Sequence, residues 1–208
     1  MKRLDPVQIR VLGCLVEKQL ATPDAYPLTL NSLRLACNQA TSREPVVDYD
    51  EGTVREAAQR LGERGLVRLA SYHGSRSTKY RHLLEESVGL SPEERALLAV
   101  LMLRGPQTLG ELKQRTEKLH RFADLGAVEE WLERLTERDL GRWLERRPGQ
   151  KEARYAHLLG DEDAEAAEAP EAEKQAQPDG GPPELEQLRQ EVAALRDEVA
   201  ALRERIGA

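Results

Sequence analysis

One order of elements occurs twice between residues 4 and 159, and this internal repeat constrains the fold more than any other feature. We call residues 4–84 repeat one and residues 90–159 repeat two. Each repeat opens with a capping residue followed by proline, Asp5-Pro6 and Ser91-Pro92, a pair that favours the start of a helix. Each continues with an apolar helix, a second helix and a third helix. The third helices are predicted within residues 53–67 and 127–141.

Both repeats end in a strand, a turn and a second strand, closing with YRHLL in repeat one and YAHLL in repeat two. Three helices followed by a β-hairpin is the order of a winged helix, a helix-turn-helix with a two-stranded wing. The sequence therefore predicts a mainly α fold with small β-hairpin wings. Its two tandem winged-helix domains are expected over residues 1–86 and 87–160. Two unrelated helical hairpins that match by chance are the alternative.

The last part of the chain has a different composition. Residues 161–183 hold eight acidic residues against one lysine and no large apolar side chain, which predicts a disordered acidic linker. Residues 184–206 repeat apolar positions at alternating spacings of three and four, the seam of a coiled-coil helix. β-branched residues at one seam position and Leu at the other favour a parallel dimer. The predicted dimerisation residues are Leu185, Leu188, Val192, Leu195, Val199, Leu202 and Ile206. A lone amphipathic helix that packs back on the domains is the alternative.

The net charge of −6 hides an asymmetry, because residues 1–160 carry +3 and residues 161–208 carry −9. In a winged helix the third helix enters the major groove of DNA, and the wing contacts the phosphate backbone. Repeat one has basic and polar residues on both elements, and residues 66–84 contain no acid. The predicted DNA-binding residues are Arg55, Gln59, Arg60, Arg64, Arg68, Arg76, Lys79 and Arg81. An ordinary solvated hairpin, whose cations protect an edge strand, is the alternative.

Repeat two is less suited to DNA. Its third helix carries four glutamates, which phosphates would repel: Glu129, Glu130, Glu133 and Glu137. A protein partner suits this repeat better, with Trp143 as a candidate surface anchor and Trp131 expected in the core.

Signatures of catalysis are missing from the sequence, which has no phosphate-binding glycine loop, HExxH motif or nucleophile elbow. We therefore expect no enzyme activity, no cofactor and no metal. Cys14 and Cys37 lie among apolar residues and are expected to be buried thiols. Asp48, Asp50 and Glu51 lack the spacing of a calcium loop and should instead stabilise the start of the third helix. No membrane span or secretory signal is visible, so a cytoplasmic location is expected.

Four separated motifs resemble the YceH family of uncharacterised bacterial tandem winged-helix proteins. They are YPLTLNSLRLACNQATSREPV (26–46), GSRSTKY (74–80), LRGPQTLGELKQR (103–115) and ARYAHL (153–158). The resemblance covers residues 4–159 and implies two winged-helix domains in a cytoplasmic protein, with a coiled-coil segment that also occurs in the family. It implies no enzyme activity and supplies no binding residues. The cluster Ser42-Arg43-Glu44-Pro45 looks like a family signature, and two roles stay open for it: ligand binding or shaping of the loop.

Two functions follow as hypotheses. The first is a dimeric DNA-binding protein, a transcriptional regulator, in which the first winged helix contacts double-stranded DNA and the coil pairs two chains. The second is a protein–protein adapter similar to the non-kleisin subunits of chromosome-condensation complexes. The acidic third helix of repeat two and the acids at 48–51 favour the adapter, whereas the basic wing of repeat one favours DNA.

Overall fold

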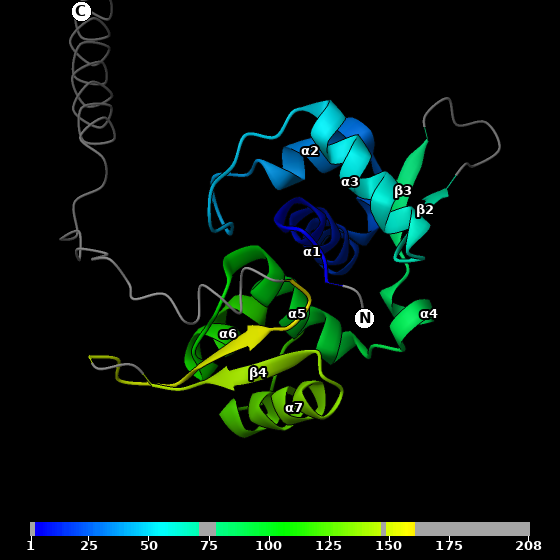
Figure 1. Ribbon diagram of the computed structural model, residues 1–208. Coiled ribbons are helices and arrows are strands. Elements are labelled where there is room, and N and C mark those ends of the chain that lie inside the picture. Colours follow the sequence, from blue (N-terminus) through cyan, green and yellow to red (C-terminus); the bar gives the residue numbers. More distant parts are fainter. Residues whose placement is uncertain (1–2, 71–77, 147–148, 161–208) are drawn as a thin grey trace, which may run out of the picture. The chain divides into compact units, whose positions relative to one another are not determined.

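The computed structural model describes residues 3–70, 78–146 and 149–160. The fold is mainly helical with small antiparallel sheets, consistent with the predicted winged-helix order (Figure 1). The elements of repeat one are α1 Pro6–Ala21, the 3-10 turn η1 Pro23–Ala25, β1 Leu28–Thr29, α2 Leu30–Cys37, α3 Glu51–Glu63, β2 Val67–Ala70 and β3 Lys79–His82. After α4 Leu84–Val88, repeat two adds α5 Pro92–Arg104, α6 Leu109–Thr116, α7 Leu125–Glu137, β4 Gly141–Leu144 and β5 Arg154–His157. The predicted linker, the coil with its seven dimerisation residues, and Arg76 lie outside the described residues.

Matching capping residues start the three main helices of each repeat. In every case a side-chain oxygen accepts a hydrogen bond from the backbone N–H three residues later, which satisfies one of the unpaired donors of the first turn. The pairs of caps are Asp5 and Ser91, Thr29 and Thr108, and Asp50 and Asp124. The helix starts expected at Asp5 and Ser91 are thus confirmed. Asp50 caps α3 and thereby stabilises its start, as was expected of the acids before the third helix.

The two sheets have related pairing. In repeat one, β3 lies between β1 and β2, and Tyr80 pairs with Leu28 on one side. In repeat two, β4 and β5 form a hairpin, and Tyr155 makes a single antiparallel bridge to Gln107. The short strand β1 was not predicted. Two residues that lead directly into a helix cap give no alternating pattern to detect.

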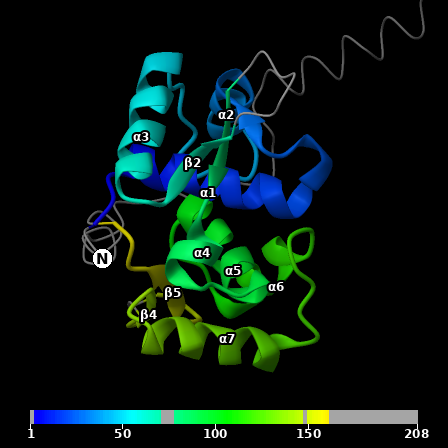
Figure 2. The same cartoon turned by 90° about the vertical axis from the view of Figure 1, so that its right-hand side faces the viewer.

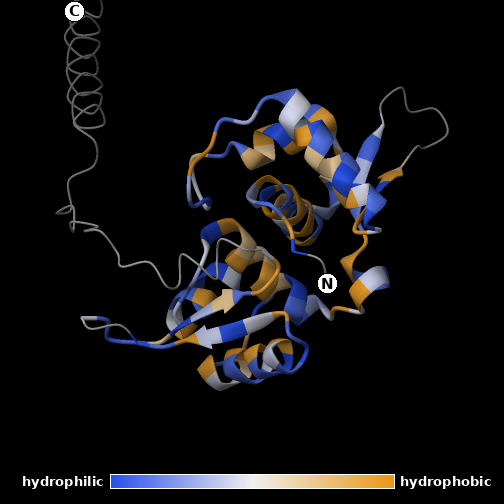
Figure 3. Ribbon diagram, viewed as in Figure 1, coloured by the Kyte–Doolittle hydropathy of each residue, from blue (hydrophilic) through white to orange (hydrophobic). Residues whose placement is uncertain are grey.

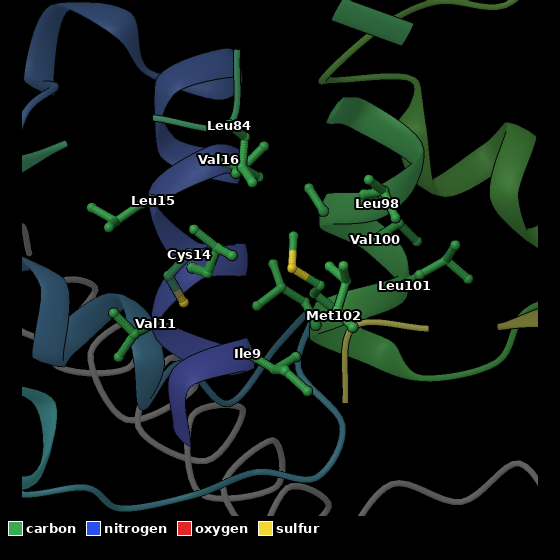
Figure 4. Packing of buried hydrophobic residues seen from close by; sticks show 14 of the residues in the cluster. Ile9, Val11, Cys14, Leu15, Val16, Leu84, Leu98, Val100, Leu101 and Met102 are labelled. Atoms are coloured by element: carbon green, nitrogen blue, oxygen red, sulfur yellow. The ribbon is translucent and has the colours of Figure 1, made fainter. Parts of the chain in front are cut away.

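The two repeats share one buried apolar cluster at the contact between α1 and α5. Residues 94–103 of α5 are all buried, so this helix is enclosed on every side rather than on one stripe. Both helices are largely apolar where they face each other (Figure 3). Figure 4 shows Met102 reaching from α5 toward α1. A Cβ on Gly13 would lie 3.0 Å from side-chain atoms of Met102 and Leu103, so glycine permits this close approach.

The apolar faces of both third helices are buried. Val54, Ala57, Ala58, Leu61 and Leu66 are buried in repeat one, as are Val128, Leu132, Leu135 and Leu140 in repeat two. Only Trp131, which was expected in the core, is half-buried at its edge. Within the part of the chain that the structure describes, no helix is long and apolar enough to span a bilayer.

Candidate nucleic-acid interface

Helix α3 lies at the outer side of repeat one (Figure 2) and exposes three predicted DNA-binding residues: Arg55, Gln59 and Arg60. Each arginine is paired with a glutamate one turn earlier, Arg55 with Glu51 at 3.6 Å and Arg60 with Glu56 at 2.6 Å. Both pairs are solvent-exposed, and such pairs contribute about 0.3–0.5 kcal/mol. A phosphate can therefore replace these carboxylates at little cost.

Arg64 has a different role from the other arginines of α3. Its guanidinium donates hydrogen bonds to Gln8 Oε1 at 2.9 Å and to the carbonyl oxygen of Arg3 at 2.7 Å. These bonds fasten the end of α3 to the start of α1. Arg64 thus positions α3 against α1, and its guanidinium is engaged within the protein.

The wing of repeat one gathers cations on one face. Arg68 of β2 stands directly opposite Arg81 of β3, and Lys79 lies two residues before Arg81. Directly opposite residues of an antiparallel pair project to the same side, so all three cations share what we call the basic wing face. Arg68 is exposed, and Lys79 and Arg81 are half-buried. The wing itself lacks acids, but Glu86 of α4 forms an ion pair with Arg81.

Repeat two has a weaker version of this face. Arg142 takes the place of Arg68 and pairs with Ala156, so no cross-strand pair of cations forms. Arg154, at the position of Lys79, donates to the carbonyl oxygen of Pro106 at 3.1 Å and lies 3.8 Å from Glu111. The four glutamates of α7 are all exposed: Glu129, Glu130, Glu133 and Glu137.

The two tryptophans of repeat two lie at the edge of the core. Arg134 stacks over the Trp131 ring at 4.2 Å, so the ring is partly covered by a cation. Trp143 is half-buried, with its ring edge-on to Tyr155 at 5.2 Å between centroids. Trp143 therefore packs against the core while keeping part of its ring accessible.

The segment between α2 and α3 is organised by a buried arginine. The Arg43 side chain is 0% exposed and forms a two-pronged ion pair with Glu17 of α1, at 2.9 and 2.6 Å. It also donates to the carbonyl oxygen of Ala36 and to Gln39 Oε1. Burial alone would raise the pKa of Glu17, but the hydrogen bonds from Arg43 lower it, so the pair is ionised. Of the two roles left open for the signature cluster, its arginine performs the structural one.

Sequence reasoning did not find this ion pair. Glu17 and Arg43 lie 26 residues apart, and neither belongs to a short-range pattern that would connect them. The expected burial of Cys14 and Cys37 is confirmed. Asn38 fixes the end of the same segment, because its side chain exchanges hydrogen bonds with both backbone groups of Tyr49, at 2.8 and 2.9 Å.

Comparison with known proteins gives one consistent family. Residues 4–150 match the family described as "Protein of unknown function, DUF480". The chain is 48% identical over 193 residues to the UPF0502 protein of Geobacter sulfurreducens, covering 92% of this chain and 86% of that one. It is 53% identical over 168 residues to the UPF0502 protein of Azoarcus sp., covering 80% and 74%. The resemblance to the YceH family is confirmed by these matches, and the chain belongs to the DUF480 family.

Proposed function

We propose that the two repeats are tandem winged-helix domains of a non-enzymatic, cytoplasmic DNA-binding protein that acts as a transcriptional regulator. Repeat one contacts double-stranded DNA, and the C-terminal coil pairs two chains. The observation that supports this proposal most is the basic wing face, on which Arg68 and Arg81 stand directly opposite each other.

Like charges placed opposite each other across a strand pair destabilise a sheet unless a counter-charge compensates them. Among the described residues Glu86 pairs with Arg81, and no carboxylate pairs with Arg68 or Lys79. A DNA phosphate near Arg68 and Lys79 would supply the remaining negative charge, and each such contact strengthens binding through counterion release. Arg55 and Gln59 lie one helical turn apart on the exposed side of α3, where side chains of a recognition helix reach base edges or flanking phosphates.

The test is fluorescence anisotropy of the full chain with a random-sequence duplex, titrated at several salt concentrations. The double variant Arg68→Ala/Lys79→Ala should bind at least about tenfold more weakly and lower the salt slope by about 2, one for each lost phosphate contact. The matched control, Arg142→Ala/Arg154→Ala, changes the equivalent positions of repeat two. It should leave affinity within about twofold, because repeat two lies outside the proposed contact. Equal losses in both variants, or no binding at low salt, would contradict the proposal.

Dimerisation has its own test. Deletion of residues 184–208 should halve the mass measured by light scattering, because the coil is proposed to hold two chains together. An unchanged mass would rule out the coil as the dimer contact.

A protein–protein adapter is the second candidate, and the acidic face of α7 favours it. Four exposed glutamates and the accessible part of Trp143 suit a basic protein partner better than DNA. If random duplex does not bind at low salt, charge reversal of Glu129 and Glu133 to Lys should abolish recovery of a partner from cell extract. Recovery of the same partner by this variant would exclude the α7 face.

A further inference from the structure

We propose that the cavity between α1, the segment 44–49 and the C-terminal end of α5 binds a small carboxylate with an apolar body, held through the Arg10 guanidinium. This cavity has a volume of about 140 Å³. Residues of both repeats line it, and none of the proposed DNA-contacting residues is among them. The inference goes beyond the proposed function and does not depend on DNA binding.

Arg10 is a buried cation that has no carboxylate partner among the described residues. It is 4% exposed, and within the described residues it forms no ion pair. Its hydrogen bonds go to two carbonyl oxygens, that of Cys37 at 3.2 Å and that of Pro45 at 2.6 Å. The other two buried arginines of the core each have a carboxylate: Arg43 has Glu17, and Arg95 has Glu85.

A buried guanidinium without a neighbouring carboxylate is unfavourable for the folded protein. Burial lowers the pKa of Arg10, since removal from water disfavours the charged guanidinium. A buried charge is normally compensated by an opposite charge. A guanidinium has five N–H donors, and the two carbonyl bonds use two of them. The remaining donors suit a carboxylate, which guanidinium binds with two parallel hydrogen bonds.

The rest of the lining explains why the ligand should have an apolar body. Leu4, Ile9 and Met102 supply aliphatic walls, and Tyr49 adds an aromatic side chain. An apolar cavity of about 150 Å³ in another protein holds benzene. The cavity beside Arg10 is therefore large enough for one six-membered ring or a branched chain of similar size, and benzoate is the simplest probe that combines this body with a carboxylate.

The walls are fixed in place without a ligand. The backbone N–H of Glu44 donates to the carbonyl oxygen of Leu103 at 2.8 Å, which joins the loop to α5. Asn38 holds both backbone groups of Tyr49. Arg10 itself joins the end of α2 to Pro45. A cavity organised in this way loses little conformational entropy when a ligand enters, which favours binding.

Glu44 lines the same cavity and is exposed. Its carboxylate opposes the entry of an anion, so a neutral residue of the same size at this position should strengthen binding. Because the residue is exposed, Glu44→Gln offers a test that leaves the buried structure intact.

The experiment is an NMR titration of the ¹⁵N-labelled full chain with sodium benzoate, and with benzyl alcohol as a neutral molecule of similar shape. Benzoate should give saturable shifts of the amide signals of Ile9, Tyr49 and Gly105. It should bind at least about tenfold more tightly than benzyl alcohol, because only benzoate can pair with Arg10. Equal affinity of the two molecules, or shifts confined to other residues, would overturn the proposal.

Two variants make the result specific. Arg10→Met should weaken benzoate at least about tenfold and leave benzyl alcohol unchanged, since it removes the charge and keeps a long apolar side chain. If this variant does not fold, Glu44→Gln still decides: it should tighten benzoate binding about two- to fivefold without affecting benzyl alcohol. Unchanged or weaker benzoate binding by Glu44→Gln would contradict the assigned position of the ligand.

Discussion

Repeat one and repeat two share a framework but differ in the parts that surround it. Both have the same three capping positions, and both place a buried histidine at the same point of the second wing strand. The backbone N–H of Leu84 donates to His82 Nδ1 at 3.3 Å, and that of Leu159 donates to His157 Nδ1 at the same distance. The differences lie in the segment before the third helix and in the packing and charge of the wing.

The features that the two repeats share maintain the fold, whereas the features that differ are specialised in each repeat. Caps and buried apolar positions recur because each satisfies a local requirement of helix or strand formation. Repeat one adds a loop organised by the buried Arg43 and a wing face with three cations. Repeat two instead buries Tyr155 against Gly141, where repeat one has Val67. Each specialised feature can be removed separately, which allows the comparison to be tested.

The largest effect is expected for Arg43→Ala. This change removes the buried partner of Glu17, which keeps only the Lys18 ammonium at 3.4 Å, and it also removes the hydrogen bonds of Arg43 to Ala36 and Gln39. The free energy of unfolding should fall by about 4 kcal/mol. Urea denaturation followed by circular dichroism measures it. Arg121→Ala is the matched control in repeat two, since Arg121 pairs with Glu117 at 3.0 Å but is exposed, and it should cost less than about 0.5 kcal/mol. Similar costs for the two variants would show that the loop of repeat one does not depend on its buried arginine.

A change specific to repeat two should have the next largest effect. A Cβ on Gly141 would overlap the ring of Tyr155, which is fully buried and cannot move aside. Gly141→Ala should therefore lower the free energy of unfolding by about 3 kcal/mol through overpacking. Gly110→Ala is the control, because a Cβ at that helical position meets no atom within 4 Å and should be neutral or slightly stabilising. A melting temperature unchanged by Gly141→Ala would refute the close packing of Tyr155.

His82, the histidine of repeat one, makes the stability of the protein depend on pH. Burial and the nearby charges of Arg95 and Arg81 lower the pKa of His82 to about 4. Neutral His82 accepts from the Leu84 N–H, while its Nε2 lies 2.6 Å from Gln19 Oε1 and donates to it. An unfolded histidine has a pKa of about 6.5, so between that pH and 4 only the unfolded state binds the proton. Stability is therefore complete above about pH 6.5 and falls as the pH is lowered.

From pH 7 to pH 5 this loss should reach about 2 kcal/mol. It is measured as the difference in pH dependence between the unmodified chain and His82→Gln, by urea denaturation at both pH values. The glutamine variant cannot take up the proton, so its stability should fall less over this range. Identical pH dependence in the two proteins would mean that His82 titrates alike in the folded and unfolded states.

Features that depend on residues close together in the sequence could be predicted, whereas contacts between distant segments could not. The caps Asp5 and Ser91 and the approximate position of α3 were predicted correctly, because these features depend on residues three or four positions apart. The cation pair Arg68–Arg81 lies on elements whose order was predicted, but its direct register emerges only from the strand pairing. The bond between Arg43 and Glu17 and the hydrogen bonds of Arg10 to two carbonyl oxygens depend on how distant segments meet. No spacing in the sequence encodes such contacts.

The smallest expected change in stability concerns Tyr155 and Tyr80, which occupy equivalent positions in the two repeats. The Tyr155 hydroxyl donates to the carbonyl oxygen of Leu132 at 2.9 Å and lies 3.0 Å from Thr136 Oγ1. Tyr155→Phe removes the hydrogen bond to the Leu132 carbonyl but leaves that carbonyl with a second donor, Thr136 Oγ1, so the expected cost is about 1 kcal/mol. Among the described residues the Tyr80 hydroxyl makes no hydrogen bond, and Tyr80→Phe should cost almost nothing. Chemical denaturation measures the free energy of unfolding of both variants. An equal loss of stability in Tyr80→Phe would show that the two hydroxyls are equivalent in solution.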